Sequence, residues 1–441
     1  MARMRWIALA LILLSSGFSV LWGSFLALGT SAGMADFKAV YYGARCLIQH
    51  NDPYLADEFL RVYRQDGWEL QSKPVMSGLF RRAISVCVNL PTTLFLVVPF
   101  AILPWKPASL LWLMLMALGL TLAAFLLWKL AGNYSPGVSL FLICLLLANC
   151  VVVFAYANAA CIVVSLCVVA VWCFLQERFV PTGIVCLAVS LAIKPHDAGL
   201  VWLYFLLAGG IYRKRSLQTL ALTVVLGLAA LLWVSSAAPH WMPELQSNIL
   251  ATSAHGALND PGPASISFRA PDPIVDLQSV ISILRDDPHI YNPTSYLVSG
   301  ALLLVWSVAT LRSRVSPTNT WLALAAIATL TMLVTYHREH DAKLLLLTVP
   351  ACAMLWAEGG PMGWFALLLN TGGILITGDI PSTTLTILTR NLPLSTAGLF
   401  GKIETILLVR PASLILLAIS IFYLWVYVRR AVPDQLPSSP V

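Results

Sequence analysis

Long apolar stretches alternate with short polar segments along almost the whole chain. Many of these stretches reach or approach the roughly 20 residues that a helix needs to cross the hydrocarbon core of a membrane. The sequence therefore predicts an all-α integral membrane protein, a bundle of about twelve transmembrane helices in one domain over residues 1–432, followed by a disordered tail at 433–441. The crossings are expected at about 6–28, 107–129, 138–155, 159–176, 181–195, 197–211, 217–236, 295–312, 320–336, 341–357, 361–378 and 405–428.

The composition agrees with this class. The chain is 59% hydrophobic and only 11% charged, whereas a soluble domain carries about 25% charged residues. Its net charge of +7 comes from basic residues in short loops, which is typical of topology signals and gives no reason to expect a nucleic acid partner. The cysteines show no metal-ligand spacing. Cys46 and Cys87 fall in one predicted loop, and the sequence leaves open whether they form a disulfide.

The basic residues set the predicted topology, because positively charged loops stay in the cytoplasm. Arg3 and Arg5 place the N-terminus there, and six crossings then return the chain to the cytoplasm at Arg213. A further apolar stretch at 89–105 contains three prolines, which break helices, so we expect it to lie at the membrane surface or to re-enter without crossing. Both termini are then cytoplasmic, and segments 29–106 and 237–294 are outer loops.

Asp36 stands where the first span meets the first outer loop. An ionisable residue at membrane depth usually has a function. Helical periodicity starts directly after it and predicts an amphipathic interfacial helix over 37–49, with Lys38 and Arg45 on its polar face. The residues alone leave two interpretations of Asp36 open, a helix N-cap and a catalytic carboxylate.

Two further polar clusters interrupt the apolar pattern. Lys194 and His196 separate two short predicted spans, where they can bind a lipid phosphate or, for the lysine, reach towards headgroups. His337, Arg338 and His340 belong to a run of ionisable residues between two spans. Contacts to a donor phosphate and sugar, a hydrated turn and a metal site are the alternatives. The metal is least favoured because the spacing is not His-Glu-x-x-His.

These features resemble the GT-C type of membrane glycosyltransferases, and within them glycosyltransferase family 87, the polyprenol-phosphate-mannose-dependent mannosyltransferases. The resemblance rests on Asp36 with its following helix, Asp52-Pro53-Tyr54, Lys194-Pro195 and His337. It implies that Asp36 is the catalytic base that accepts the proton of the acceptor hydroxyl. Donor phosphate or sugar contacts are expected from Lys194, His196, His337, Arg338 and His340, and loop contacts to substrate from Asp52, Tyr54 and Arg269.

The expected function is transfer of one sugar, most readily mannose, from a polyprenyl-phosphate donor to a glycan or glycolipid acceptor, with inversion, on the extracytoplasmic side of the cytoplasmic membrane. One carboxylate suffices as base, because phosphate is already a competent leaving group. No Asp-x-Asp occurs in 29–106, so neither a metal-bound nucleotide sugar nor any cofactor is expected. The alternative is a transporter or flippase of lipid-linked precursors, which also needs buried charges and interrupted helices.

Overall fold

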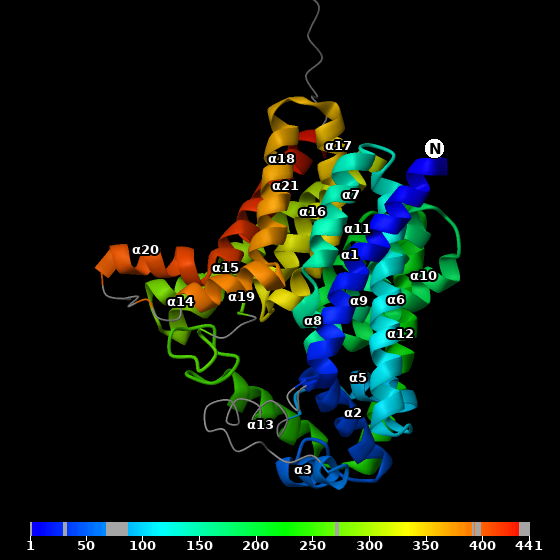
Figure 1. The fold of residues 1–441 in the computed structure, drawn as a ribbon, viewed down its shortest axis with the longest axis vertical. Coiled ribbons are helices and arrows are strands. Elements are labelled where there is room, and N and C mark those ends of the chain that lie inside the picture. The colour runs from blue at the N-terminus through cyan, green and yellow to red at the C-terminus, as the bar shows by residue number, and fades with distance from the viewer. Residues whose placement is uncertain are drawn as a thin grey trace, which may run out of the picture.

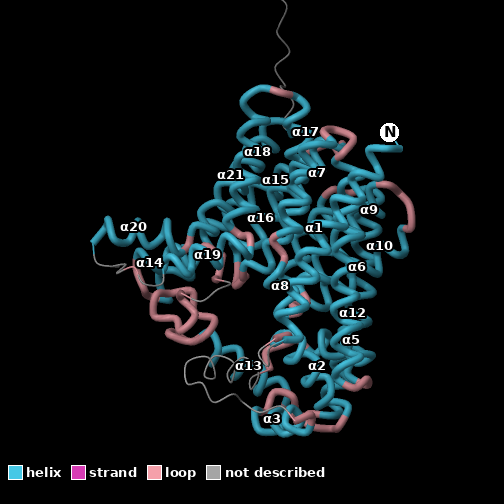
Figure 2. The backbone as a smooth tube through the Cα atoms, in the orientation of Figure 1, coloured by secondary structure: helices cyan, strands magenta, loops and turns pink. Residues whose placement is uncertain are grey.

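The computed structural model describes residues 2–29, 33–67, 87–269, 273–389, 392 and 398–431. The predicted tail at 433–441 lies outside this part of the chain. The described residues are helical and form no strand; Ile274 and Arg338 make an isolated β-bridge. Figures 1 and 2 show upright helices side by side, with a group of shorter helices at the lower end and a second group to the side.

The helices fall into two sets according to their place in the molecule. The upright set comprises α1 (Ala2–Gly29), α6 (Trp105–Ala131), α7 (Pro136–Ala148), α9 (Ala160–Leu175), α10 (Val180–Ile193), α11 (Pro195–Leu207), α12 (Gly210–Ala237), α15 (Pro288–Arg312), α16 (Pro317–Val334), η1 (Glu339–Thr348), α17 (Val349–Glu358), α18 (Gly360–Ile376) and α21 (Pro411–Ala431). The connecting set comprises α2 (Ala35–Ile48), α3 (Ala56–Gln65), α5 (Pro91–Ala101), α8 (Val151–Tyr156), α13 (Trp241–Ser253), α14 (Gln278–Leu284), α19 (Asp379–Thr389) and α20 (Gly398–Val409).

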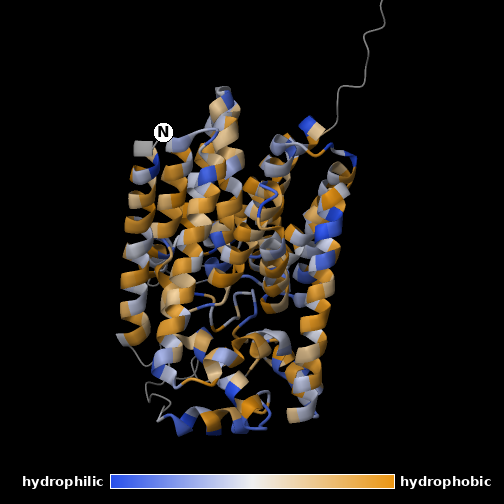
Figure 3. Cartoon of the chain, turned by 90° about the vertical axis from the view of Figure 1, so that its right-hand side faces the viewer, coloured by the Kyte–Doolittle hydropathy of each residue, from blue (hydrophilic) through white to orange (hydrophobic). Residues whose placement is uncertain are grey.

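Six described helices are long and apolar enough to cross a membrane: α1, α6, α12, α15, α16 and α21. Helices α18 and α19 form a seventh candidate if the pair, bent by 63°, is taken as one span. These helices identify an integral membrane protein, and Figure 3 shows their mostly apolar surfaces above a polar lower end. The predicted count of about twelve crossings is not established by these lengths.

Helix α16 lies at the centre of the bundle. In its most apolar window 78% of the residues are buried, against 11% for α12 at the periphery. It packs against α21, α15, α11 and η1. Its start is well defined, because Ser316 Oγ accepts a hydrogen bond from Asn319 N (3.1 Å) and Pro317 occupies the first turn. The polar segment that follows α16 is therefore placed deep within the protein.

Several predicted spans start elsewhere in the structure, among them α12 and α15, which begin seven residues earlier than predicted. The segment predicted at 341–357 begins as the 3₁₀ helix η1, which continues into α17. The segment predicted at 405–428 begins at Pro411, because proline cannot continue α20. The stretch at 89–105 forms α5, whose 11 residues extend about 16 Å at 1.5 Å per residue. That length is too short for a core of about 30 Å and fits the predicted interfacial segment.

Candidate functional site

The junction between α10 and α11 places Lys194 among carboxylates. Pro195 ends α10 and opens α11, which leaves Lys194 in an extended conformation between them. Its Nζ forms an ion pair with Asp341 Oδ1 and lies 3.4 Å from Asp197 Oδ2. Both carboxylates are buried. Lys194 is thus matched by two negative charges from two helices far apart in the sequence.

Helix α5 supports this junction from the side. Thr92 Oγ1 donates to the carbonyl oxygen of Ala192 (2.5 Å), and Thr93 Oγ1 donates to that of Ile193 (2.9 Å). These carbonyls belong to the last turn of α10, where no partner within the helix remains. Helix α5 also packs against α2, so it connects the helix that carries Asp36 with the Lys194 junction.

His337 joins the same cluster. Its Nδ1 lies 2.8 Å from the carbonyl oxygen of Thr335, and its Nε2 lies 3.0 Å from Asp197 Oδ1. The second contact is close but poorly aligned for a hydrogen bond, so its attraction is mainly electrostatic. Burial acts to lower the pKa of His337, but the Asp197 carboxylate outweighs it, with a further contribution from Asp341, and raises that pKa. With His337 protonated, the positive charges of Lys194 and His337 balance the negative charges of Asp197 and Asp341.

The other two histidines lie at the edge of this cluster. The His196 ring packs against the His337 ring with centroids 4.9 Å apart, and its side chain is 38% exposed. His340 Nε2 lies 3.5 Å from Asp341 Oδ1. The structure therefore brings Lys194, His196, His337 and His340 together, and their binding of the donor stays a prediction. We call these four residues, with Asp197 and Asp341, the Lys194 cluster.

A metal ion is the alternative occupant of this cluster. The ligand atoms of His196, Asp197 and His337 lie within 4.8 Å of one another, a composition that suits divalent transition metals. However, the Lys194 ammonium lies 3.4 Å from the same Asp197 carboxylate and already supplies the positive charge. Asp197 Oδ1 and Oδ2 and His337 Nε2 form ion pairs but no hydrogen bond among the described residues. The expectation of no metal stays a prediction.

Asp36 lies in the first turn of α2 and is not its N-cap. The cap position is Met34, in the left-handed conformation. Asp36 Oδ2 instead accepts a hydrogen bond from Asn158 Nδ2 (2.7 Å), while Asn158 Oδ1 accepts from Ala160 N at the start of α9. The half-buried carboxylate is thus oriented by the turn before α9. The N-cap interpretation of Asp36 was therefore wrong.

Asn158, which donates a hydrogen bond to Asp36, lies in the part of the chain that identifies the family. Residues 88–336, more than half of the chain, match the model of glycosyltransferase family 87. The chain belongs to glycosyltransferase family 87. No curated protein and no solved structure matches it. The matched region includes Asn158, Lys194 and Asp197, whereas Asp36 precedes it and His337 follows it directly.

Family membership makes the protein a glycosyltransferase, with donor and acceptor substrates. It also favours the enzyme over the transporter. The partly exposed Asp36 carboxylate, oriented by an amide, suits a general base, and the Lys194 cluster suits the polar end of a lipid-linked donor.

In this family 87 protein, the burial of Lys38 differs from the prediction. It was expected on the polar face of α2, but only 1% of it is exposed, because Trp105 of α6 covers it at 5.7 Å from ring centroid to Nζ. Burial lowers the pKa of Lys38 to about 8. A lysine two residues from Asp36 therefore carries its charge in a protected position.

Arg338 connects two loops of the glycosyltransferase. Its Nε donates to Tyr336 Oη (2.5 Å), and one terminal nitrogen donates to the carbonyl oxygen of Leu258 (3.2 Å). Val275 N also donates to the carbonyl oxygen of His337 (2.9 Å). Leu258 and Val275 are thereby held against the segment that carries His337 and His340.

The predicted loop residues Asp52 and Tyr54 use their polar groups inside the loop. Asp52 Oδ1 accepts from Tyr54 N (2.8 Å), and Tyr54 Oη donates to the carbonyl oxygen of Asn89 (2.8 Å). Both residues are buried. These contacts favour the turn that Asx-Pro sequences form over direct substrate contact. Cys46 and Cys87 are free, buried thiols, and burial raises the pKa of Cys87 to about 11.

Sequence reasoning missed several charged residues that the structure places in or near the site. They are Asp197, Asp341, Lys343, Asp379 and Arg410. Three of them, Asp341, Lys343 and Arg410, fall within spans predicted at 341–357 and 405–428. A charge inside a predicted span was the available signal.

Proposed function

We propose that the protein transfers one sugar from a polyprenyl-phosphate donor to the hydroxyl group of a glycan or glycolipid, with Asp36 as the catalytic base. The observation that carries this proposal is the orientation of the half-buried Asp36 carboxylate by Asn158 (2.7 Å) in a family 87 glycosyltransferase. A carboxylate within hydrogen-bond reach of the acceptor hydroxyl takes its proton as the oxygen attacks the anomeric carbon.

The reaction requires no acid in addition to this base. The bond between the anomeric carbon and the phosphate oxygen breaks as the new glycosidic bond forms, and the lipid phosphate leaves with the bonding electrons. Direct displacement at the anomeric carbon inverts its configuration. A glycosidase, by contrast, needs a second carboxyl group to protonate a poor leaving group.

The Lys194 cluster, with the neighbouring Arg338, is our candidate for the donor's polar end. Lys194 is balanced by Asp197 and Asp341, so its ammonium acts mainly to order the cluster. Arg338 and the partly exposed His196 supply hydrogen-bond donors for phosphate and sugar oxygens, and the buried His340 lies beside them. Mannose as the sugar, a polyprenol as the lipid and the extracytoplasmic side of the cytoplasmic membrane follow from the resemblance and from the distribution of basic residues.

Substitution of Asp36 by Asn tests the base directly. Asn keeps an oxygen that can accept from Asn158 but cannot take a proton at neutral pH, so we expect transfer to fall by about 10²–10⁴-fold. Donor-lipid binding and the thermal unfolding midpoint should change little. The assay uses purified protein, polyprenyl-phosphate mannose and a hydroxyl acceptor.

Asp57→Asn is the matched control, because Asp57 is an exposed carboxylate in the first turn of α3 in the same loop. It should transfer sugar at the wild-type rate. Near wild-type transfer by Asp36→Asn would exclude Asp36 as the base.

A further inference from the structure

Arg410 is a buried cation whose side chain forms no hydrogen bond with any residue that the structure describes. It lies between α20 and α21, and only 1% of it is exposed. Its Nε and both terminal nitrogens lack a hydrogen-bond partner. The guanidinium lies over the Phe268 ring, 4.8 Å from the centroid, which contributes attraction but accepts none of its five N–H groups. Burying a guanidinium without hydrogen-bond partners costs free energy, unless a ligand accepts its hydrogen bonds and balances its charge.

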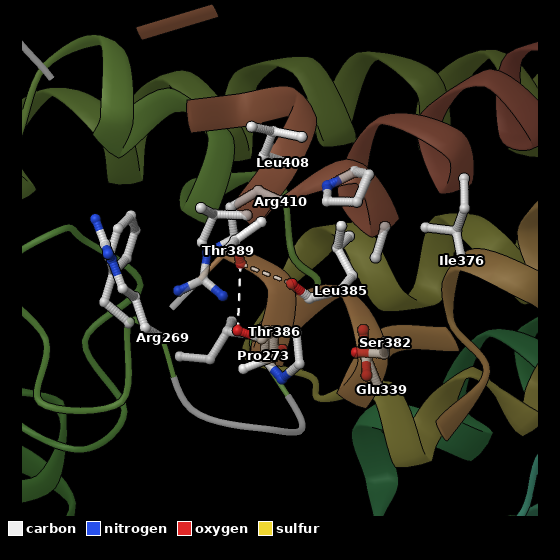
Figure 4. Close-up of a pocket in the computed structure, with 15 residues that line it drawn as sticks. Arg269, Pro273, Glu339, Ile376, Ser382, Leu385, Thr386, Thr389, Leu408 and Arg410 are labelled. Atoms are coloured by element: carbon white, nitrogen blue, oxygen red, sulfur yellow. Dashed lines mark hydrogen bonds between the residues drawn. The ribbon is translucent and has the colours of Figure 1, made fainter. Parts of the chain in front are cut away.

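The guanidinium points into a pocket (Figure 4). Arg410 lines this pocket together with residues of α19, α20 and η1 and with Phe268, Arg269, Pro273 and Ile274. The cavity between them is about 20 Å³ and opens to solvent. The polar part of the wall includes Arg269, Ser382 and Thr386, and the rest is largely apolar. Arg269 is exposed and donates to the carbonyl oxygen of Leu392 (3.3 Å), so it stands at the open side.

The described residues that line the pocket carry more positive than negative charge. The lining arginines are Arg410 and Arg269, and the lining carboxylate is Glu339, while Asp276 and Arg338 act on Arg410 from outside the lining. The Asp276 carboxylate accepts a hydrogen bond from Ser279 N (2.9 Å) and forms no ion pair with Arg410 within 4 Å among the described residues. One more cation than anion therefore faces the pocket, and the most buried of these cations is the one without a hydrogen bond.

The helices beside the pocket carry an exposed apolar surface. Helices α19 and α20 lie across the upright bundle at its side (Figure 1). They expose large side chains, with Leu388 at 68%, Leu399 at 71% and Phe400 at 83%. Helices that lie across a bundle with exposed Leu and Phe are suited to the boundary between acyl chains and headgroups. A buried arginine beside such a surface is placed where lipid phosphates are found.

We propose that the Arg410 pocket binds a phosphate group, supplied by the headgroup of an anionic lipid or by free phosphate, at a site separate from the Lys194 cluster. The planar guanidinium can donate two parallel hydrogen bonds to phosphate oxygens, and Arg269 at the open side can add a second cation. This inference does not depend on the transfer reaction, because binding alone satisfies the buried donors.

The test uses the purified full-length protein in detergent and three probes: inorganic phosphate, dioctanoyl phosphatidic acid, and dioctanoylglycerol as the same lipid without phosphate. Calorimetric titration should detect binding of a phosphate-bearing probe and weaker or no binding of dioctanoylglycerol. Saturable binding of inorganic phosphate alone identifies free phosphate as the source. Preference for phosphatidic acid over both other probes identifies the lipid headgroup.

Arg410→Gln should weaken binding of that probe by about tenfold or more, since charge-assisted hydrogen bonds are lost. Arg410→Lys, which keeps the charge without the planar donor pair, should weaken it less. Arg215→Gln is the matched control, because Arg215 is also buried but already donates to the carbonyl oxygen of Phe174 (2.8 Å). It should leave phosphate binding unchanged.

The unfolding midpoint of the ligand-free protein separates binding from a structural role. Arg410 has no hydrogen bond to lose among the described residues, so Arg410→Gln should leave this midpoint unchanged or raise it. The proposal is overturned if neither phosphate probe binds better than dioctanoylglycerol, or if Arg410→Gln and Arg410→Lys keep wild-type affinity. A sharp fall of the ligand-free midpoint with binding retained would also overturn it and make Arg410 structural.

Discussion

The balance of charge around His337 makes the stability of the protein depend on pH. The Asp197 carboxylate raises the pKa of His337 above its usual value near 6.5 despite burial. A raised pKa in the folded state means that the proton stabilises the fold. This contribution is fully present below about pH 6.5, and it is lost as pH rises through the folded pKa. The groups that face His337 are Lys194, His196, Asp197 and Asp341.

His337→Gln should therefore cost the most stability at acidic pH. We expect the difference in unfolding midpoint between wild type and His337→Gln to be largest near pH 6 and to shrink as pH increases above the folded pKa. Thermal unfolding in detergent between about pH 5.5 and 9 measures this difference. His289→Gln is the control, because His289 is outside the cluster. A difference that stays constant or grows with pH would contradict a protonated His337.

Sequence reasoning at this scale found the cations and missed their partners. Because Lys194, His337 and Asp36 occupy span ends on one predicted side, the sequence predicts that Lys194 and His337 approach each other and flank one cavity with Asp36. Lys194 and His337 do meet through Asp197, and the shared cavity with Asp36 stays a prediction. The pairing of Lys194 with Asp341 was not predictable, because their separation along the chain says nothing about which helices are neighbours. The orientation of Asp36 by Asn158 depends on the same unknown packing of α2 against α8.

At the scale of elements, one buried ion pair fixes the bend between α18 and α19. Lys343 Nζ of η1 lies 2.9 Å from Asp379 Oδ1 and also donates to the carbonyl oxygen of Asn149 (2.8 Å). Asp379 Oδ2 accepts from Val152 N (2.6 Å) at the start of α8. Gly378 permits this close approach, since a Cβ there would lie 2.9 Å from Asn149 Cγ. Four elements are joined at this point.

Removal of one member of this pair should be strongly destabilising. Lys343→Met leaves Asp379 as an uncompensated buried charge, which typically costs about 3–5 kcal/mol. The double variant Lys343→Met/Asp379→Asn should recover much of that loss, because the introduced amide carries no charge and keeps an oxygen for Val152 N. Chemical denaturation of the wild type and the two variants measures the effect. Equal destabilisation of the single and double variants would show that packing, and not charge, determines it.

The sequence predicted which segments are helical, but it predicted only some of the positions at which the helices break. Each predicted span coincides with a helix or a pair of helices, because apolar runs of that length can satisfy their backbone only as helices within a membrane. The break at Pro411 had a signal in the sequence, since proline ends α20. The 3₁₀ form of η1, whose Asp341 and Lys343 pair with residues of other segments, had no such signal.

At the scale of the whole molecule, the difference between six long helices and about twelve predicted crossings has a physical basis. Helices α9 and α10 have 16 and 14 residues, and most of α9 is buried by neighbours. A short helix covered by other helices need not match the full thickness of the hydrocarbon core, because its ends can meet polar groups of the protein. Helix length alone therefore does not decide whether α9 and α10 cross, and the count of about twelve crossings stays a prediction.

The structure supports one part of the predicted topology directly. Arg314 lines a small cavity together with Ala208 at the end of α11, so the two basic segments at 208–215 and 312–316 lie at the same end of the molecule. Two predicted crossings separate these segments, so they must lie on the same side of the membrane. Both segments also carry the basic residues typical of cytoplasmic loops. Ser216 is buried and cannot report on this side, whereas Lys214 and Arg314 are exposed.

Cysteine labelling of intact cells tests the orientation. Eight of the nine native cysteines are buried and Cys144 is half-buried, so the wild-type protein should react little with an impermeant maleimide and serves as the baseline. We expect Asp57→Cys to be labelled from outside, and Lys214→Cys and Arg314→Cys to be labelled only after the membrane is opened. Labelling of Lys214→Cys and Arg314→Cys from outside, with Asp57→Cys protected, would invert the topology. Labelling of only one of those two would contradict their placement at one end, and with it the even number of crossings between them.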